Sequence, residues 1–168
     1  LRVRGSVEED ADAMRAIRGI DRRRGLVWFM ANAASPLERQ LYVTSFRKRE
    51  APRRISRETG WHTVRMSPDA RYYLDTFSDS EHPPSVKLHN ADGSTRATLV
   101  ANTLDASHPY APYLASQQKS QFGTLRARDG QTLDSQPTPA NALQPGRRYP
   151  VIVHVYGGPG VLGRVRNA

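Results

Sequence analysis

The sequence predicts a mainly β protein, with two blades of a β-propeller followed along the chain by the first strands of a separate α/β domain. Three observations predict this fold class. The 168 residues include 12 prolines and 12 glycines but only 38% hydrophobic residues, a composition typical of short strands joined by many turns. A set of four short strands occurs twice. A later run of apolar, β-branched residues is followed by two glycines. Such a run is typical of a buried strand in a parallel or mixed sheet, and the glycines indicate a turn after it.

The first four strands follow a short polar segment. Residues 1–12 are polar, and we expect them to be frayed. Residues 13–20 are assigned to a strand because the same pattern returns later, and residues 26–30, LVWFM, combine aromatic and branched side chains. Residues 40–46 alternate in polarity, and residues 53–57 are expected to form a polar edge strand after a proline turn. Together these strands make one predicted blade.

The second set of four strands repeats the first. It is predicted at residues 61–66, 71–77, 85–89 and 97–101. Three pairs of apolar residues are separated by 45 positions, namely Trp28 with Tyr73, Leu41 with Val86, and Val43 with Leu88. A period of about 40–50 residues with four strands in each copy is typical of propeller blades. We therefore expect the blades to occupy residues 13–102, with Trp61, Tyr72 and Tyr73 packed inside them.

The turn between the first two strands of the second set carries the sequence Ser67-Pro68-Asp69-Ala70. Glycine is favoured at the last position of such a turn when the backbone there has a positive φ. The sequence has Ala70 instead, so we expect backbone strain at this residue.

The C-terminal part of the chain is predicted to contain a linker and a hairpin. Residues 103–120 show no periodicity and are assigned to a linker between domains. Residues 121–128 alternate as a strand, Asp129-Gly130 is a hairpin turn, and residues 131–134 begin the return strand. Pro137 and Pro139 follow, and because proline cannot donate to a ladder they shorten that strand. A polar loop is expected over residues 141–148.

A buried strand over residues 151–155 is predicted to lead into the candidate site. In α/β proteins, sites lie at the carboxyl ends of strands, and glycines there let the backbone approach a substrate closely. Tyr156 lies at this end and is followed by Gly157, Gly158 and Pro159. His154 alternates with the apolar residues and is expected to be a buried, hydrogen-bonded histidine rather than a base.

Three segments resemble the prolyl oligopeptidase family of serine peptidases, specifically its dipeptidyl peptidase IV-like branch: the S-P-D-A-R-Y turn, the F-G-T-L-R-A-R-D-G-Q-T-L hairpin and the Y-P-V-I-V-H-V-Y-G-G-P turn. The resemblance covers about residues 14–167 and implies the last two propeller blades, a linker and, over residues 121–168, the start of an α/β-hydrolase domain. It implies that Tyr156 gives its hydroxyl to the oxyanion hole and that Gly157, Gly158 and Pro159 shape that turn. It also implies an enzyme that releases N-terminal dipeptides, Xaa-Pro or Xaa-Ala, through an acyl-enzyme.

The catalytic triad of such an enzyme is not present in the sequence. The α/β-hydrolase version supplies Ser from a G-x-S-x-G elbow, then Asp, then His. No G-x-S-x-G occurs in the 168 residues, and residues 160–163 do not fit the family pattern. We therefore expect the segment to stop within the hydrolase domain, before the triad, and the chain alone to be inactive.

Several other functions are disfavoured by the sequence. The net charge of +9 invites a nucleic-acid partner, but the arginines fall in predicted turns and no nucleic-acid-binding motif is present. Five histidines without ligand spacing and zero cysteines predict no metal site, and no nucleotide loop or other cofactor motif occurs. No apolar run approaches the ~20 residues of a membrane span.

The alternative function is a non-catalytic, propeller-like interaction module. The resemblance implies peptide substrates, a homodimeric full-length enzyme, and a periplasmic, membrane-anchored or secreted location.

Overall fold

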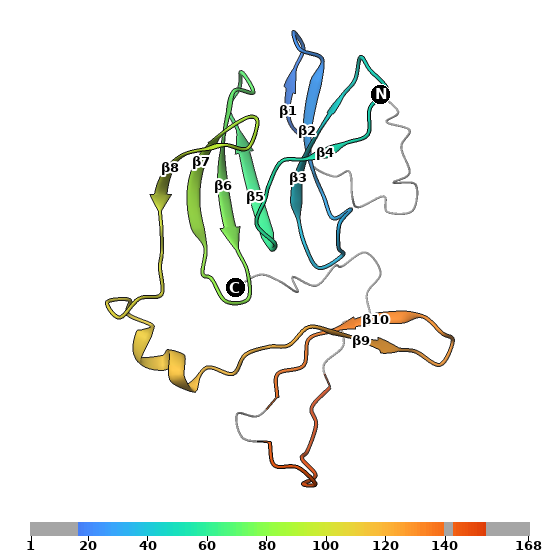
Figure 1. The fold of residues 1–168 in the computed structure, drawn as a ribbon, viewed down its shortest axis with the longest axis vertical. Coiled ribbons are helices and arrows are strands. Elements are labelled where there is room, and N and C mark those ends of the chain that lie inside the picture. The colour runs from blue at the N-terminus through green and yellow to red at the C-terminus, as the bar shows by residue number, and fades with distance from the viewer. Residues whose placement is uncertain (1–16, 140–142, 154–168) are drawn as a thin grey trace. The chain divides into compact units, whose positions relative to one another are not determined.

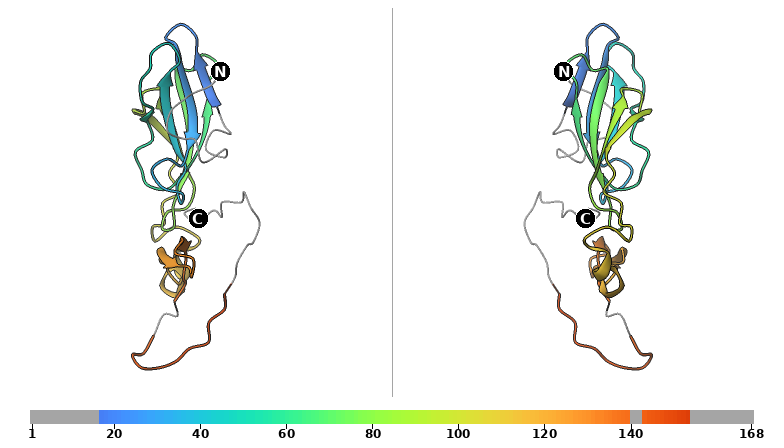
Figure 2. Two further views of the ribbon diagram at one scale, coloured as in Figure 1. Left: turned by 90° about the vertical axis from the view of Figure 1, so that its right-hand side faces the viewer. Right: turned by 90° about the vertical axis from the view of Figure 1, so that its left-hand side faces the viewer.

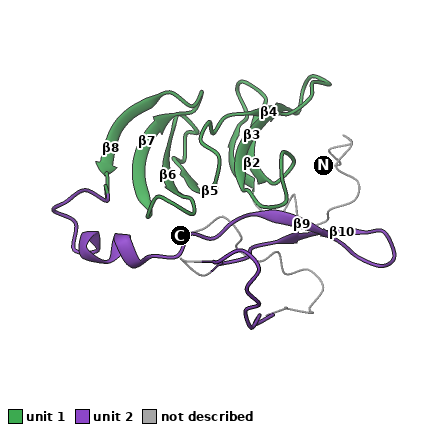
Figure 3. Cartoon of the chain, turned by 60° about the horizontal axis from the view of Figure 1, so that its bottom comes forward, with its two compact units in different colours: residues 1–103, 164–168 green, residues 104–163 purple. Residues whose placement is uncertain are grey.

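The computed structural model describes residues 17–139 and 143–153. They fall in two compact units, the first reaching Thr103 and the second beginning at Leu104 (Figure 3). The expected frayed segment, residues 1–12, lies outside the described residues.

The first unit consists of two four-stranded antiparallel sheets, each ordered as a simple meander (Figure 1). The first sheet contains β1 (Ile17–Asp21), β2 (Leu26–Ala31), β3 (Gln40–Ser45) and β4 (Arg53–Arg54). The second contains β5 (Trp61–Met66), β6 (Tyr72–Ser78), β7 (Ser85–Asn90) and β8 (Thr95–Val100). The predicted pair of four-stranded sets is confirmed, because both copies have the same strand order.

The two sheets pack face to face around a shared apolar core (Figure 2). Strand β5 contacts β1 and β3 of the first sheet. A parallel bridge also joins Arg39 to Trp61, with the His62 amide donating to the Arg39 carbonyl at 3.0 Å. The core contains Trp28, Met30, Leu41, Val43, Ile55, Val64, Ala70 and Tyr73. Because both sheets contribute, neither can bury its apolar face alone.

The expected strain at Ala70 is confirmed. Its φ is +52°, in the left-handed region, and its side chain is only 1% exposed. The methyl group belongs to the core, where it lies near Gly19 of β1. A Cβ on Gly19 would lie 2.6 Å from the Met66 Cγ atom. The missing side chain at Gly19 therefore makes room for Met66 and for the Ala70 methyl group.

The offset of 45 residues that relates Val43 to Leu88 in the sequence does not hold in the third strand of each sheet, although the predicted period of about 40–50 residues does. Trp28 pairs with Val43, whereas Tyr73, its counterpart 45 residues later, pairs with His89, which is 46 residues after Val43. Because side chains alternate between faces, this one-residue difference turns Leu88 away from the core and turns His89 into it. His89 is buried, and Leu88 is only partly buried.

The predicted edge strand over residues 53–57 is shorter in the structure, where β4 contains only two residues. The amides of Ile55 and Ser56 both donate to the Leu41 carbonyl, at 2.7 and 3.4 Å, which interrupts the regular ladder. The Arg54 side chain bends back and donates to the Ser56 carbonyl at 2.8 Å.

The second unit contains the predicted hairpin. A 3-10 helix, η1 (Ala111–Ser116), precedes the antiparallel strands β9 (Gly123–Arg126) and β10 (Thr132–Ser135). Gly130 has a φ of +88° in the turn. Strand β10 ends before Pro137, so the predicted shortening is confirmed. In the described part of the chain, no helix has the length and apolar character needed to span a membrane.

The buried strand predicted over residues 151–155 is not formed in its described part. Residues 151–153 have no secondary structure, and the exposed fractions of Val151, Ile152 and Val153 are 80%, 96% and 78%. The β-branched run is compatible with a strand, but a strand needs a neighbour for its hydrogen bonds. No described segment pairs with these residues.

Candidate functional site

A buried histidine and aspartate form the centre of a polar cluster on the second sheet. The register pairs Val64 of β5 with Asp75 of β6, so His62, two residues before Val64, shares a sheet face with Asp75. The two side chains have exposed fractions of 0% and 4%, and 2.7 Å separates His62 Nδ1 from Asp75 Oδ2. This is a short hydrogen bond removed from solvent.

The second ring nitrogen of His62 is also engaged. His62 Nε2 lies 3.0 Å from the Glu58 carbonyl oxygen. Because a carbonyl oxygen only accepts, Nε2 carries a proton and donates it. One further proton lies between Nδ1 and the Asp75 carboxylate. Whichever atom holds this proton, His62 and Asp75 together have no net charge, which is why the pair can be buried.

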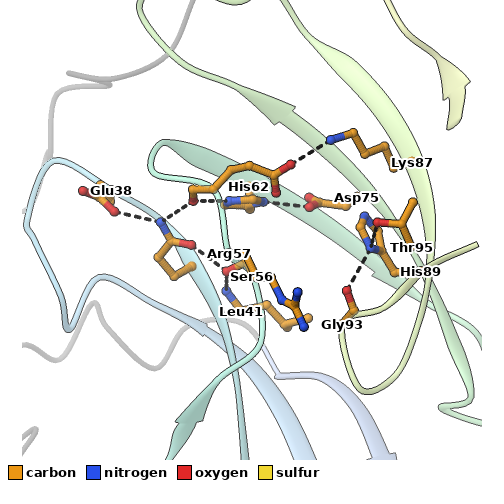
Figure 4. A network of polar contacts seen from close by, with 12 residues as sticks. Glu38, Leu41, Ser56, Arg57, His62, Asp75, Lys87, His89, Gly93 and Thr95 are labelled. Atoms are coloured by element: carbon orange, nitrogen blue, oxygen red, sulfur yellow. Dashed lines mark hydrogen bonds and ion pairs between the residues drawn. The ribbon is translucent and has the colours of Figure 1, made fainter.

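Glu58 connects this pair to the rest of the cluster through its carbonyl and its carboxylate. Figure 4 shows the network of polar contacts around His62, Asp75 and Lys87. The Glu58 carbonyl oxygen also accepts hydrogen bonds from Gln40 Nε2 at 3.2 Å and from Arg54 Nη2 at 3.1 Å. Its carboxylate accepts a hydrogen bond from Lys87 Nζ at 2.7 Å. Burial alone would raise the pKa of Glu58, but the bond and charge of Lys87 outweigh it and lower that pKa. Glu58 therefore makes hydrogen bonds with residues of four strands, β3, β4, β5 and β7.

A second branch of the cluster runs through the first sheet. Gln40 is 0% exposed and donates from Nε2 to Glu38 Oε2 at 2.8 Å. Its Oε1 accepts a hydrogen bond from the Ser56 hydroxyl at 2.5 Å, and that hydroxyl accepts from the Leu41 amide at 2.9 Å. The cluster thus continues from one sheet into the other.

Tyr73 and His89 stack beside this cluster. Their ring centroids are 4.9 Å apart and the planes differ by 11°. His89 Nδ1 lies 3.3 Å from the Gly93 carbonyl oxygen and 3.3 Å from the Thr95 hydroxyl oxygen. Burial, with the negative charges of Asp75 and Glu58, raises the pKa of Tyr73 far above its usual range. The phenol therefore stays protonated.

The arrangement joins the sheets and does not supply a catalytic base. A general base needs a free nitrogen within reach of a substrate proton. His62 Nε2 is already bonded to a backbone carbonyl, and the ring is fully buried. The described residues contain no group of three or more His, Cys, Asp or Glu side chains suited to a metal ion.

The residues predicted to form the oxyanion site are not among those just described. Tyr156, Gly157, Gly158 and Pro159 lie outside the described residues, as does His154. The structure instead places His89 beside the buried pair of His62 and Asp75 (Figure 4), and no sequence motif marks these three residues as a site. A signal for Asp75 exists in the sequence, since it lies two residues from both Tyr73 and Phe77 in an alternating strand.

Comparisons of the sequence and of the structure with known proteins point to the same family. Residues 7–84 match the family model of the dipeptidyl peptidase IV (DPP IV) N-terminal region. This segment belongs to that family. The match includes β1 to β6, and so both sheets of the first unit contribute to it.

Dipeptidyl peptidases are similar to the chain over a longer stretch. Mouse dipeptidyl peptidase 8 is 29% identical over 148 residues, and the probable dipeptidyl-aminopeptidase B of Emericella nidulans is 29% identical over 143 residues. Each match covers 84% of this chain and 16% of the relative. The chain therefore spans about a sixth of the length of these curated relatives.

A solved structure supports the fold. The crystal structure of Porphyromonas gingivalis dipeptidyl peptidase 4 superposes with a TM-score of 0.70 at 21% sequence identity, covering 82% of this chain and 19% of that one. At this identity the likeness concerns the fold, and it agrees with the blade-like sheets of the DPP IV N-terminal region.

Proposed function

We propose that this chain is the part of a serine dipeptidyl peptidase that joins the last two propeller blades to the first strands of the α/β-hydrolase domain. The complete enzyme would release Xaa-Pro or Xaa-Ala dipeptides from peptide N-termini through an acyl-enzyme. The observation that carries the proposal is the chain order: two four-stranded meanders of a DPP IV N-terminal region, then a connecting segment, then a hairpin.

The extent of the similarity supports placing the hairpin in the same protein family. The family model ends at residue 84, whereas the matches to dipeptidyl peptidases cover 84% of the 168 residues and omit only about 27 of them. A continuous match of this length extends well past residue 84, into β9 and β10. The hydrolase assignment of residues 121–168 rests on this extent and on the sequence resemblance.

Tyr156 has a defined chemical role in this proposal. Attack on the scissile carbonyl places negative charge on its oxygen, and a hydroxyl held at that position stabilises the intermediate more than the substrate. Gly157, Gly158 and Pro159 would shape the turn that holds the phenol. The nucleophile, its base and the carboxylate would come from sequence beyond these 168 residues, because no G-x-S-x-G occurs within them.

The test is the Tyr156→Phe variant of the complete protein that contains this chain. Removal of one oxyanion donor lowers kcat by about 100- to 1000-fold. Ala-Pro-p-nitroanilide turnover should fall by that factor while KM changes little. Tyr113→Phe is the matched control, because Tyr113 is 61% exposed in η1, and it should leave kcat unchanged. Equal kcat values for Tyr156→Phe and the unsubstituted enzyme would remove Tyr156 from the oxyanion hole.

A further inference from the structure

One end of the first unit is strongly basic because two turns are fixed together. Arg47, in the segment between β3 and β4, donates from Nη1 to the Arg23 carbonyl at 3.0 Å and from Nη2 to the Arg22 carbonyl at 2.6 Å. The Phe46 amide also donates to the Gly25 carbonyl at 2.9 Å. A Cβ on Gly25 would lie 2.5 Å from the Arg47 Cδ atom, so the glycine permits this approach. The two basic turns are thus held side by side.

We define this surface, the basic end, by the charged residues of the two turns and of the cavity beside them. The basic members are Arg22, Arg23, Arg24, Arg47, Lys48, Arg49 and Arg53, and the acidic members are Asp21, Glu50 and Asp92. Seven positive and three negative charges leave a net charge of +4. All of the basic members are exposed. The excess of positive charge favours an anionic partner.

A cavity of about 370 Å³ lies at the basic end. Its lining includes Trp28 and Val43, the basic residues Arg24 and Arg53, and the carboxylates of Glu50 and Asp92. The Arg24 Nε atom lies 3.7 Å from Asp21 Oδ2, and the Arg24 side chain is 67% exposed. The indole N–H of Trp28 donates to the Ala91 carbonyl at 3.1 Å, so it is not available to a ligand. The volume lies within the range of about 300–1,000 Å³ that ligand sites occupy.

We propose that the basic end binds an acidic peptide segment of a partner protein, with a carboxylate between Arg24 and Arg53. Arginine pairs well with carboxylates. Peptide N–H groups can donate to Glu50 and Asp92, which also line the cavity. A nucleic acid fits less well, because Trp28, which is 2% exposed, offers no surface on which a base can stack. This surface is independent of the proposed peptidase activity.

The test measures fluorescence anisotropy of labelled octaglutamate titrated with the 168-residue chain at low salt. The Arg24→Gln/Arg53→Gln double variant should weaken binding by about tenfold, because it removes two charge-assisted contacts. The Arg65→Gln/Arg128→Gln double variant is the matched control. It removes the same charge from exposed positions outside the basic end and should change the Kd by less than about twofold. Circular dichroism of each variant checks that the fold is kept.

Three results would overturn the proposal. Equal weakening by both double variants would show that net charge alone attracts the peptide. Tighter binding of an oligothymidylate of the same length than of octaglutamate would replace the acidic peptide with a nucleic acid. A lack of saturable octaglutamate binding to the unsubstituted chain would show that the basic end is a solvated surface.

Discussion

Removal of either member of the His62–Asp75 pair should destabilise the first unit, and the two losses should not add. His62→Leu leaves the Asp75 carboxylate buried without the hydrogen bond at 2.7 Å, which is its only one from the described residues. A buried charge deprived of its partner costs about 3–5 kcal/mol of unfolding free energy. Asp75→Leu leaves the His62 Nδ1 atom buried without its hydrogen bond, which costs about 1–3 kcal/mol.

The double variant His62→Leu/Asp75→Leu should be more stable than His62→Leu alone. It replaces both polar groups with apolar side chains, and such replacements are often close to neutral. The Glu58 carbonyl loses the His62 donor but keeps those of Gln40 and Arg54, so it is not left unpaired. We therefore expect a coupling free energy of at least about 2 kcal/mol between positions 62 and 75.

Urea unfolding followed by tryptophan fluorescence measures these values. The two tryptophans of the chain, Trp28 and Trp61, both lie in the first unit, so their emission reports on the two sheets and not on the hairpin. Single-variant losses that add to within about 0.5 kcal/mol would refute the reasoning, because additivity is the behaviour of groups that do not interact.

Two further predictions concern the core and the alkaline stability. Gly19→Ala should lower the unfolding free energy by about 1–3 kcal/mol, because its new Cβ meets the Met66 side chain. In urea unfolding, the double variant Gly19→Ala/Met66→Ala should lose less stability than the sum of the two single losses. A purely additive loss would contradict this contact. Tyr73 has a folded-state pKa raised by burial above its unfolded value of about 10, so its stabilising contribution is present below pH ~10 and is lost as the pH rises beyond it. Unfolding midpoints measured from pH 8 to 11 should therefore fall less steeply for Tyr73→Phe, and parallel curves would contradict the prediction.

Strand positions could largely be predicted from the sequence because aromatic and β-branched runs are bounded there by turn residues. The strand over residues 61–66 is observed with the predicted bounds, and the Asp129-Gly130 turn forms as expected. The register between paired strands could not be predicted from the sequence as well as the strand positions. His89 is buried in place of Leu88 because the second sheet has one more residue between its paired positions than the first. The similarity between the two sets of strands does not reveal such a shift.

The sequence pattern does not predict the polar cluster, for a different reason. Gln40, His62 and Asp75 lie in alternating strands, where a polar residue ordinarily faces solvent. Their burial depends on partners far along the sequence, such as the Glu58 carbonyl for His62 and the Ser56 hydroxyl for Gln40. A pattern within one strand contains no information about those partners. Similarly, the apolar character of residues 151–153 favours a buried strand, but burial requires a neighbouring strand that the described residues do not supply.

The proposal that this chain joins the propeller and hydrolase domains of a serine dipeptidyl peptidase is tested most directly by one assay. The complete protein that contains residues 1–168 is mixed with Ala-Pro-p-nitroanilide, and p-nitroaniline release is followed with and without a serine-directed fluorophosphonate. We predict release of the N-terminal dipeptide that the fluorophosphonate abolishes, and no release by the 168-residue chain alone. No release by the complete protein, or release that the fluorophosphonate leaves unchanged, would contradict the proposal.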